Sequence, residues 1–444
     1  MSDSHIKALR ADWICPVASP PVRNGTVLID GPRIVDVVAT VPDGIAVESF
    51  DGCAIFPGFV NTHIHLELTI LRGFLENLSF IEWIRRLTHV KYDHLSEEDL
   101  RISAELGAVE CLRAGVTTLG EVTDVGAGWN AMIRFGLRGV AYQEIFGPAE
   151  ESASEALEAL EQKVDKLRGQ ASPTCRVGVS PHAPFTVSAG LYQHVKRFAV
   201  REKLPIAVHL AESAAEGEFV RKGTGPFAEF LKSRGISVSG RGMTPIAYLD
   251  SLEVLGKGTL VIHAIDCDAD DVVRLKKNGV GIAHCPKSNL KLGHQIAPLK
   301  EFLESNIAVG LGTDSGASNN AVDMFEEMRT AAFLQRTRAG NSIDSMPISA
   351  SEALHLATLG GAQALGMEKD VGSLERGKLA DMAVVDLNDP ALQPVYDPVA
   401  TMVYSANRNN VVATFLGGRR VDRDASELVS RAATIAARLK NISW

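Results

Sequence analysis

The sequence predicts an α/β protein: a (β/α)8 barrel of the TIM type with a small composite β-sandwich domain built from both termini. Eight short apolar runs recur along the middle of the chain, and amphipathic helical patterns separate them. Several runs are apolar on both faces, as Leu260-Val261-Ile262 is, which is typical of strands in a buried parallel sheet. The two flanks alternate instead like short antiparallel strands and turns.

The barrel strands are expected in order along the chain. The apolar runs that predict them are residues 55–60, 117–122, 139–145, 176–180, 206–209, 259–263, 280–284 and 308–312. The first clear helix should begin after Ser96, because Asp99 completes an approximate capping box, and should stop at Gly115. Further helices are expected near residues 155–167, 189–202, 269–278, 298–305 and 324–335.

The flanks are too small to form separate cores comfortably, so the economical prediction joins them. We expect residues 1–57 and 369–430 to form the β-sandwich and residues 58–368 the barrel, with a C-terminal helix over 431–444.

Composition narrows the class of protein. The net charge of −9 leaves no basic surface for nucleic acid, and no stretch approaches the ~18 apolar residues of a membrane span. The six cysteines are scattered without a CxxC pair, which favours a reducing compartment over a disulfide framework. We expect a cytoplasmic protein that acts on a small molecule without nucleic acid or membrane partners. The sequence leaves a homo-oligomer open.

Side chains suited to metal binding stand where the predicted strands end, and in barrels of this kind the active site lies at that end. His63 and His65 are two residues apart, so in a strand they project from one face. The later strand ends carry Glu121, Glu144, His182, His209, His263, His284 and Asp314. The remaining histidines in helical or loop contexts are expected to lie outside the site; they are His89, His94, His194, His294 and His355.

The metal ligands expected from this pattern are His63, His65, His209 and Asp314. Three imidazole nitrogens and one carboxylate oxygen suit Zn²⁺ or a similar ion and leave a position open for water. His263 is either a further ligand or a group that orients the water. No lysine stands at a strand end to bridge a second ion, so we expect one divalent metal per chain.

Glu212 follows the ligand His209 by three residues and is the expected proton carrier, since it can reach both the water and the substrate. His182 lies between Pro181 and Pro184, which fix its loop, and is expected to contact the substrate. Asn289, in Pro286-Lys287-Ser288-Asn289, is a further candidate for substrate binding.

Together these motifs closely resemble the amidohydrolase superfamily, in its branch of aminohydrolases and chlorohydrolases. The resemblance covers almost the whole chain and includes Pro57-Gly58-Phe59-Val60-Asn61-Thr62-His63-Ile64-His65, Ser180-Pro181-His182, His209-Leu210-Ala211-Glu212, Gly312-Thr313-Asp314-Ser315 and Gly372-Ser373-Leu374-Glu375. It implies that His63, His65, His209 and Asp314 bind Zn²⁺ or Fe²⁺. It also implies that Glu212 transfers the proton, His263 steadies the water and His182 meets the substrate.

The loop after His65 indicates a finer branch. Leu71-Arg72-Gly73 and Trp83 look like deaminases of S-adenosylhomocysteine and related nucleosides, whereas Leu66-Glu67-Leu68 looks more like aminodeoxyfutalosine deaminases. The nucleoside branch places a ribose-binding glutamate shortly after the tryptophan. Residues 84–92 contain no acid, and Asp93 is the nearest.

Three side chains of this loop region are expected at the substrate. Trp83 offers an apolar surface, Glu67 lies close to the histidine pair, and Arg72 either pairs with a substrate carboxylate or closes the loop on a nearby acid. The expected reaction is hydrolytic deamination of an adenosine-type nucleoside modified at the 5′ position. The alternatives are a triazine chlorohydrolase or aminohydrolase, and a deaminase of another heterocycle such as guanine or cytosine.

Overall fold

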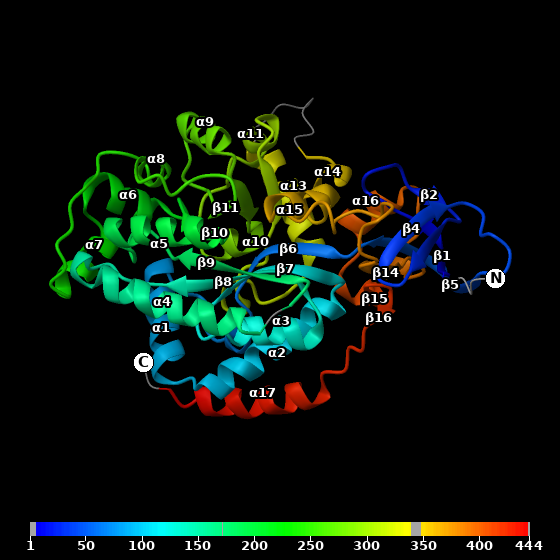
Figure 1. The fold of residues 1–444 in the computed structure, drawn as a ribbon, viewed down its shortest axis with the longest axis horizontal. Coiled ribbons are helices and arrows are strands. Elements are labelled where there is room, and N and C mark those ends of the chain that lie inside the picture. The colour runs from blue at the N-terminus through cyan, green and yellow to red at the C-terminus, as the bar shows by residue number, and fades with distance from the viewer. Residues whose placement is uncertain (1–5, 171, 339–347, 443–444) are drawn as a thin grey trace.

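The computed structural model describes residues 6–170, 172–338 and 348–442. An eight-stranded parallel barrel forms the larger part, and a second sheet lies at one end of it (Figure 1). The barrel strands pair in chain order, each with the next, which confirms the predicted fold class. They are β6 (Phe59–Ile64), β7 (Val116–Thr123), β8 (Arg138–Ile145), β9 (Cys175–Pro181), β10 (Ile206–Leu210), β11 (Thr259–His263), β12 (Gly281–His284) and β13 (Ala308–Leu311).

Both termini build the second sheet, as expected. In hydrogen bonding it is one mixed sheet of eight strands, in the order β16-β15-β14-β5-β1-β3-β4, with β2 paired to β1. Its core includes Leu9, Ile55, Val384 and Phe415. The strands are β1 (Ile6–Ile14), β2 (Val22–Arg23), β3 (Thr26–Asp30), β4 (Arg33–Val38), β5 (Ala46–Pro57), β14 (Met382–Asp386), β15 (Val411–Leu416) and β16 (Arg419–Arg420).

The first predicted barrel strand was wrong in one respect, because the apolar run 55–60 belongs to two strands. β5 ends at Pro57 in the terminal sheet, and β6 begins at Phe59 in the barrel. The break lies at Gly58, whose N–H donates to the Asp381 carbonyl in the direction of the terminal sheet. The Phe59 N–H donates instead to the Gly115 carbonyl in front of β7. Burial on both sides of the break makes the run apolar throughout, so hydrophobicity alone does not reveal it.

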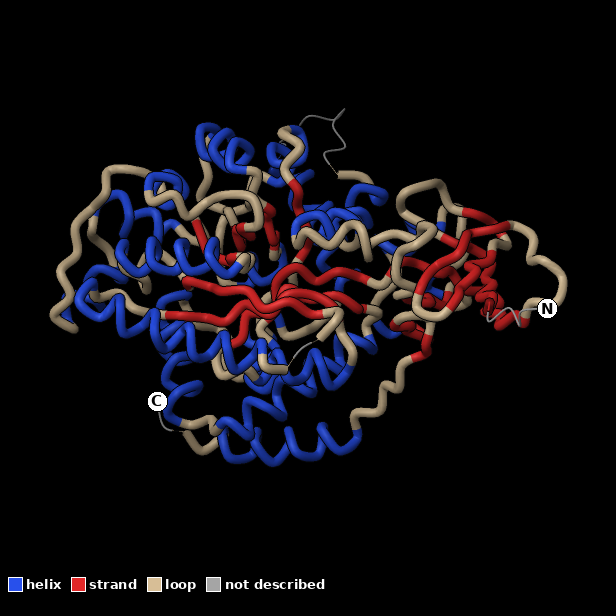
Figure 2. The backbone as a smooth tube through the Cα atoms, in the orientation of Figure 1, coloured by secondary structure: helices blue, strands red, loops and turns tan. Residues whose placement is uncertain are grey.

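Helices flank the barrel strands (Figure 2). The described helices of the barrel region are α1 (Phe80–Asp93), α2 (Glu97–Arg113), α3 (Ala127–Phe135), α4 (Ala153–Arg168), α5 (Ala189–Glu202), α6 (Ala214–Lys222), α7 (Pro226–Ser233), α8 (Pro245–Ser251), α9 (Ala269–Asn278), α10 (Pro286–Lys291), α11 (Leu299–Glu304), α12 (Gly316–Asn319), α13 (Met324–Arg338), α14 (Ala350–Leu356) and α15 (Leu359–Ala364). Two more follow, α16 (Pro398–Tyr404) and α17 (Ser426–Leu439). Ser96 and Asp99 form the predicted capping box of α2. None of the helices in the described residues is long and apolar enough to cross a membrane.

The C-terminal helix begins earlier than expected. α17 starts at Ser426 rather than 431, and Asp424 accepts a hydrogen bond from the Ser426 N–H just before it. Its apolar positions begin at Leu428, which packs with Val109 of α2, and continue through Ile435 and Leu439. The helical pattern of apolar residues therefore starts before residue 431, within the range 369–430 that was expected to belong to the β-sandwich.

The first and last barrel strands meet at a seam that side chains and loop backbone close. The Asp314 N–H donates to the His63 carbonyl at 2.9 Å, and the Thr313 N–H donates to Asn61 Oδ1 at 3.0 Å. Asn61 Nδ2 donates in return to Thr313 Oγ1 at 2.7 Å. Gly312 permits this approach, since a Cβ there would lie 2.9 Å from the His63 backbone nitrogen. The seam fixes the end of β6 against the loop after β13.

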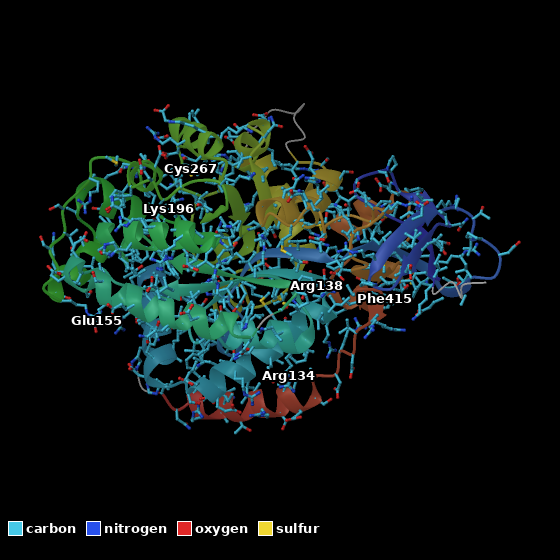
Figure 3. All side chains as sticks on the ribbon, in the orientation of Figure 1. Arg134, Arg138, Glu155, Lys196, Cys267 and Phe415 are labelled. Carbon is cyan, nitrogen blue, oxygen red and sulfur yellow. The ribbon has the colours of Figure 1, made fainter. Side chains whose placement is uncertain are left out.

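A buried ion pair joins the barrel to the terminal sheet. Arg138 starts β8 and donates from Nε and Nη2 to the two Asp381 carboxylate oxygens at 3.0 and 3.2 Å. The side chains are 11% and 2% exposed. Figure 3 labels Arg138 where the barrel meets the smaller sheet. Because the pair is sheltered from water, loss of one partner leaves the other charge uncompensated.

We therefore predict that Arg138→Met lowers the free energy of unfolding by about 3–5 kcal/mol, the usual cost of breaking a buried pair from one side. The measurement is the urea-unfolding midpoint and slope. Arg201→Met is the matched control, because Arg201 pairs with Glu161 at a site where its side chain is 62% exposed. Equal, small shifts for both variants would show that the junction does not depend on this pair.

Candidate active site at the carboxyl end of the barrel

The structure brings the four predicted metal ligands together. His63 lies in β6, His65 follows that strand, His209 lies in β10, and Asp314 follows β13. Ring nitrogens of the three histidines lie within 4.8 Å of one another. Asp314 Oδ1 is 3.3 Å from His63 Nε2 and 3.7 Å from His65 Nε2. Donor atoms from the first, fifth and last barrel strands thus converge on one point.

Short hydrogen bonds hold the Asp314 carboxylate in place. Ser288 and Ser318 donate to its Oδ2 at 2.6 and 2.9 Å, and the Ser315 N–H donates to Oδ1 at 2.6 Å. The backbone of Asp314 is left-handed, with φ of 57°, a conformation that costs free energy outside glycine. The loop and its serines thereby aim Oδ1 at the histidines.

The donor set fits a divalent metal such as zinc. Burial, partly offset by Asp314, lowers the pKa of His63, and burial together with neighbouring histidines lowers the pKa of His65 and His209 well below the usual value. The rings are therefore neutral and can offer lone pairs. Both ring nitrogens of His63 are buried without a hydrogen-bond partner among the described residues. Such orphaned nitrogens are costly unless something else, such as a cation, satisfies them.

Glu212 lies beside this donor set, between two imidazoles. Its Oε1 is 3.6 Å from His263 Nε2 and 3.6 Å from His294 Nε2. Burial would raise the pKa of Glu212, but His263 and His294 lower it below its usual value. The carboxylate is therefore ionised near neutral pH and able to accept a proton.

The loop that carries Glu212 is anchored by a second glutamate. Glu216 of α6 accepts hydrogen bonds from the Ala211 and Glu212 N–H groups at 2.8 and 2.9 Å. Ala211 is left-handed, with φ of 54°, so the chain turns sharply between His209 and Glu212. Glu216 is fully buried, and it holds this turn at both amides.

His182 and Asn289 both reach the site. His182 Nδ1 is hydrogen-bonded to Thr186 Oγ1 at 2.8 Å. The ring centroid of His182 lies 4.7 Å from that of His209. Asn289 Oδ1 is 2.9 Å from His263 Nδ1. Asn289 thus orients His263, and its Nδ2 is buried without a hydrogen-bond partner in the described chain. Both residues therefore lie beside the histidines of the site, and their contact with a substrate stays a prediction.

Glu67 does not have the surroundings of a substrate-binding group, and that prediction was wrong. Its carboxylate accepts hydrogen bonds from Thr123 Oγ1 and from the N–H groups of Asp124, Val125 and Ala127. The side chain is 2% exposed. Its acceptor capacity is consumed in fastening the loop after β7 to the loop after β6.

Arg72 has the second of the two roles that the sequence left open. Its guanidinium pairs with Glu110 of α2, which also pairs with Arg408 and accepts from the Val322 N–H. Arg72 therefore closes its loop on a protein acid, and the prediction that it binds substrate is corrected.

Trp83 and Asp93 both lie on α1, in different surroundings. Trp83 is 8% exposed and packs in an apolar cluster with Leu71. Its neighbour Phe80 contacts His294, with ring centroids 4.4 Å apart, and a role of Trp83 at the substrate stays a prediction. Asp93 is 63% exposed and pairs with His89 at 2.7 Å. It therefore offers no buried acid for a sugar.

Sequence reasoning missed two groups at the site. His294 was expected outside it but contacts Glu212, as described above. Lys91 of α1 lies 3.9 Å from Glu144 at the end of β8. An apolar period marks where a helix packs, but it does not show which long side chain reaches across to another strand, so neither contact had a signal in the sequence.

The comparisons with known proteins agree with this geometry. The profile of the amidohydrolase family matches residues 54–421. A protein of Pelotomaculum thermopropionicum named 5-methylthioadenosine/S-adenosylhomocysteine deaminase is 34% identical, with 94% of this chain and 95% of that protein covered. A protein of Methanobrevibacter smithii named 5′-deoxyadenosine deaminase is 32% identical, with 94% and 93% covered.

Solved structures share the fold over nearly the whole chain. A crystal structure described as an adenosine deaminase from Xanthomonas campestris with bound zinc has a TM-score of 0.86 at 27% identity, and 98% of each chain is covered. An atrazine chlorohydrolase from Arthrobacter aurescens complexed with zinc has a TM-score of 0.84 at 22% identity, with 97% and 99% covered, and shows the fold alone. Given the family match and these relatives, the chain belongs to the amidohydrolase family.

Proposed function

We propose that this protein is a metal-dependent hydrolase that deaminates an adenosine-type nucleoside modified at the 5′ position. The observation that carries the proposal is the placing of Glu212 between His263 and His294, beside the donor set of His63, His65, His209 and Asp314. The names of the curated relatives support the substrate class. Within the chain, residues 58–368 are the catalytic domain of this proposal.

His63, His65, His209 and Asp314 would hold one divalent ion, Zn²⁺ or Fe²⁺. When bound, such an ion lowers the pKa of water towards neutrality and so makes a nucleophile available at working pH. The neutral imidazoles suit this role because they need not lose a proton to bind.

Glu212 would accept the proton that the attacking water releases and pass it to a ring nitrogen next to the amine-bearing carbon. The proton of the added hydroxyl is then transferred to the amine, the carbon–nitrogen bond breaks, and ammonia leaves with a carbonyl formed in its place. His263, held by Asn289, steadies the water and the carboxylate. His182 projects towards the rest of the nucleoside.

The metal assignment predicts one tightly bound divalent ion per chain. His65→Ala should lower metal content and activity together, because it removes one of four donors. The measurement is elemental analysis beside an ammonia-release assay. His194→Ala, on the outer helix α5, is the control and should keep both. Two ions per chain in active protein would contradict the mononuclear site.

The proton-transfer role predicts a separation of metal binding from turnover. Glu212→Gln keeps the shape of the side chain but removes the acceptor, so turnover should fall by about 10²–10⁴-fold while metal content persists. Glu218→Gln is the control. Glu218 lies on α6, the helix that follows Glu212, and this variant should keep turnover near the wild-type value. Nearly unchanged turnover in Glu212→Gln would assign the proton transfer to another group, with His263 first to be examined.

The substrate class predicts ammonia release from 5′-modified adenosines. The panel contains aminodeoxyfutalosine, S-adenosylhomocysteine, methylthioadenosine and 5′-deoxyadenosine beside guanine, cytosine and a chlorinated triazine. We expect the highest kcat/KM among the four nucleosides. Reaction of the triazine or a free base, with none of any adenosine derivative, would overturn the nucleoside assignment and leave the hydrolase assignment intact.

A further inference from the structure

His294 is an imidazole at the site that no step of the proposed reaction uses. Its Nε2 lies 3.6 Å from Glu212 Oε1, just beyond the length of a hydrogen bond, and its side chain is 6% exposed. This nitrogen is buried without a hydrogen-bond partner among the described residues. A buried polar atom of this kind costs free energy unless a group from outside the chain satisfies it. Its position beside Glu212 indicates that this group belongs to the substrate.

The segment around α10 positions both imidazoles that flank Glu212. The His294 N–H donates to the Asn289 carbonyl at 2.9 Å, and the Asn289 side chain holds His263 through Oδ1, which is 2.9 Å from His263 Nδ1. Phe80 of α1 packs edge to face against the His294 ring, with centroids 4.4 Å apart and planes at 86°. The backbone hydrogen bond and the aromatic contact therefore fix where the ring of His294 lies.

The His294 nitrogen that faces Glu212 is a hydrogen-bond donor. A neutral imidazole carries a proton on one ring nitrogen and a lone pair on the other. A lone pair on Nε2 would be repelled by the negative carboxylate oxygen, so the proton is favoured on Nε2. At 3.6 Å this N–H is too distant for a full hydrogen bond to Glu212, and it remains available to an acceptor that lies beside the carboxylate.

The surroundings of the two imidazoles distinguish the two sides of the proton-carrying carboxylate. The ring of His263 lies 5.8 and 5.6 Å from those of His63 and His209, which belong to the metal-binding set. The ring of His294 contacts Phe80 instead. In adenine, N1 is flanked by the amine-bearing carbon C6 on one side and by C2 on the other, and N3 follows C2. If C6 faces the metal-binding set, the edge with C2 and N3 faces His294.

We propose that His294 Nε2 donates a hydrogen bond to N3 of the adenine ring while Glu212 protonates N1. This inference rests on the proposed function and specifies which ring atoms of the substrate the site recognises. N3 carries a lone pair and no proton, so it complements the N–H of His294. The acceptor N7 lies on the far side of the amine-bearing carbon, away from this edge.

The test compares 5′-deoxyadenosine with its 3-deaza analogue, in which C–H replaces N3, using metal-loaded wild type and His294→Phe. Phenylalanine keeps a flat ring against Phe80 but removes the donor. The ratio of kcat/KM for the two compounds should be roughly fivefold to a hundredfold larger in wild type than in His294→Phe, as expected when a buried donor loses its acceptor. The change in ring reactivity is the same for every variant and cancels from this comparison.

Three further variants keep the test decisive. His294→Gln retains a side-chain N–H donor and should recover part of the wild-type ratio. His294→Leu gives the same comparison as His294→Phe if the phenylalanine variant folds poorly. His355→Leu, on α14, is the control and should keep the wild-type ratio. A structural role of His294 would lower activity on both compounds alike and leave the ratio unchanged.

Equal ratios in wild type, His294→Phe and His294→Leu would overturn the N3 assignment while deamination of nucleosides stands. A ratio that responds to His294→Phe only for the 7-deaza analogue would also overturn it, because it would place the imidazole on the other side of the amine. If wild type deaminates no adenosine derivative but does deaminate another heterocycle on the panel, the proposed function fails and the N3 assignment fails with it.

Discussion

The seam between β6 and the loop after β13 is the constraint on which the site depends. Asn61 and Thr313 exchange two hydrogen bonds across it, and the Asp314 N–H binds the His63 carbonyl. These contacts join residues about 250 positions apart and place a carboxylate against the first-strand histidines. The metal site takes donors from the first and the last strand of the barrel sheet, β6 and β13. These donors can meet only because the two strands are joined at the seam.

Backbone geometry and buried polar contacts then aim the side chains. Ala211, His263 and Asp314 follow or end barrel strands with left-handed φ values of 54°, 73° and 57°. Each such residue costs on the order of 1–3 kcal/mol, and it persists because surrounding contacts determine it. Hydrogen bonds hold two of these residues in place: Glu216 accepts from the Ala211 N–H, and two serines donate to the Asp314 carboxylate. Part of the backbone strain in the described residues therefore lies where the chemistry is proposed.

The sequence could predict the barrel and the ligands because both leave local signals. Apolar periodicity located every barrel strand except the division at Gly58, and the ends of those strands held His63, His209 and Asp314. Side chains that cross between elements were different. Glu67 and Arg72 lie in a recognisable loop, but their partners are backbone amides and an acid on α2, which no local pattern reveals. His294 and Lys91 reach the site from outside the strands for the same reason.

The central claim is that one metal ion, held by this donor set, serves a nucleoside deaminase. Titrating metal-free protein with Zn²⁺ while following ammonia release from 5′-deoxyadenosine tests it most directly. The account predicts no activity without metal and a plateau when one equivalent per chain has been added. Full activity of the metal-free protein, or a plateau only at two equivalents, would contradict it.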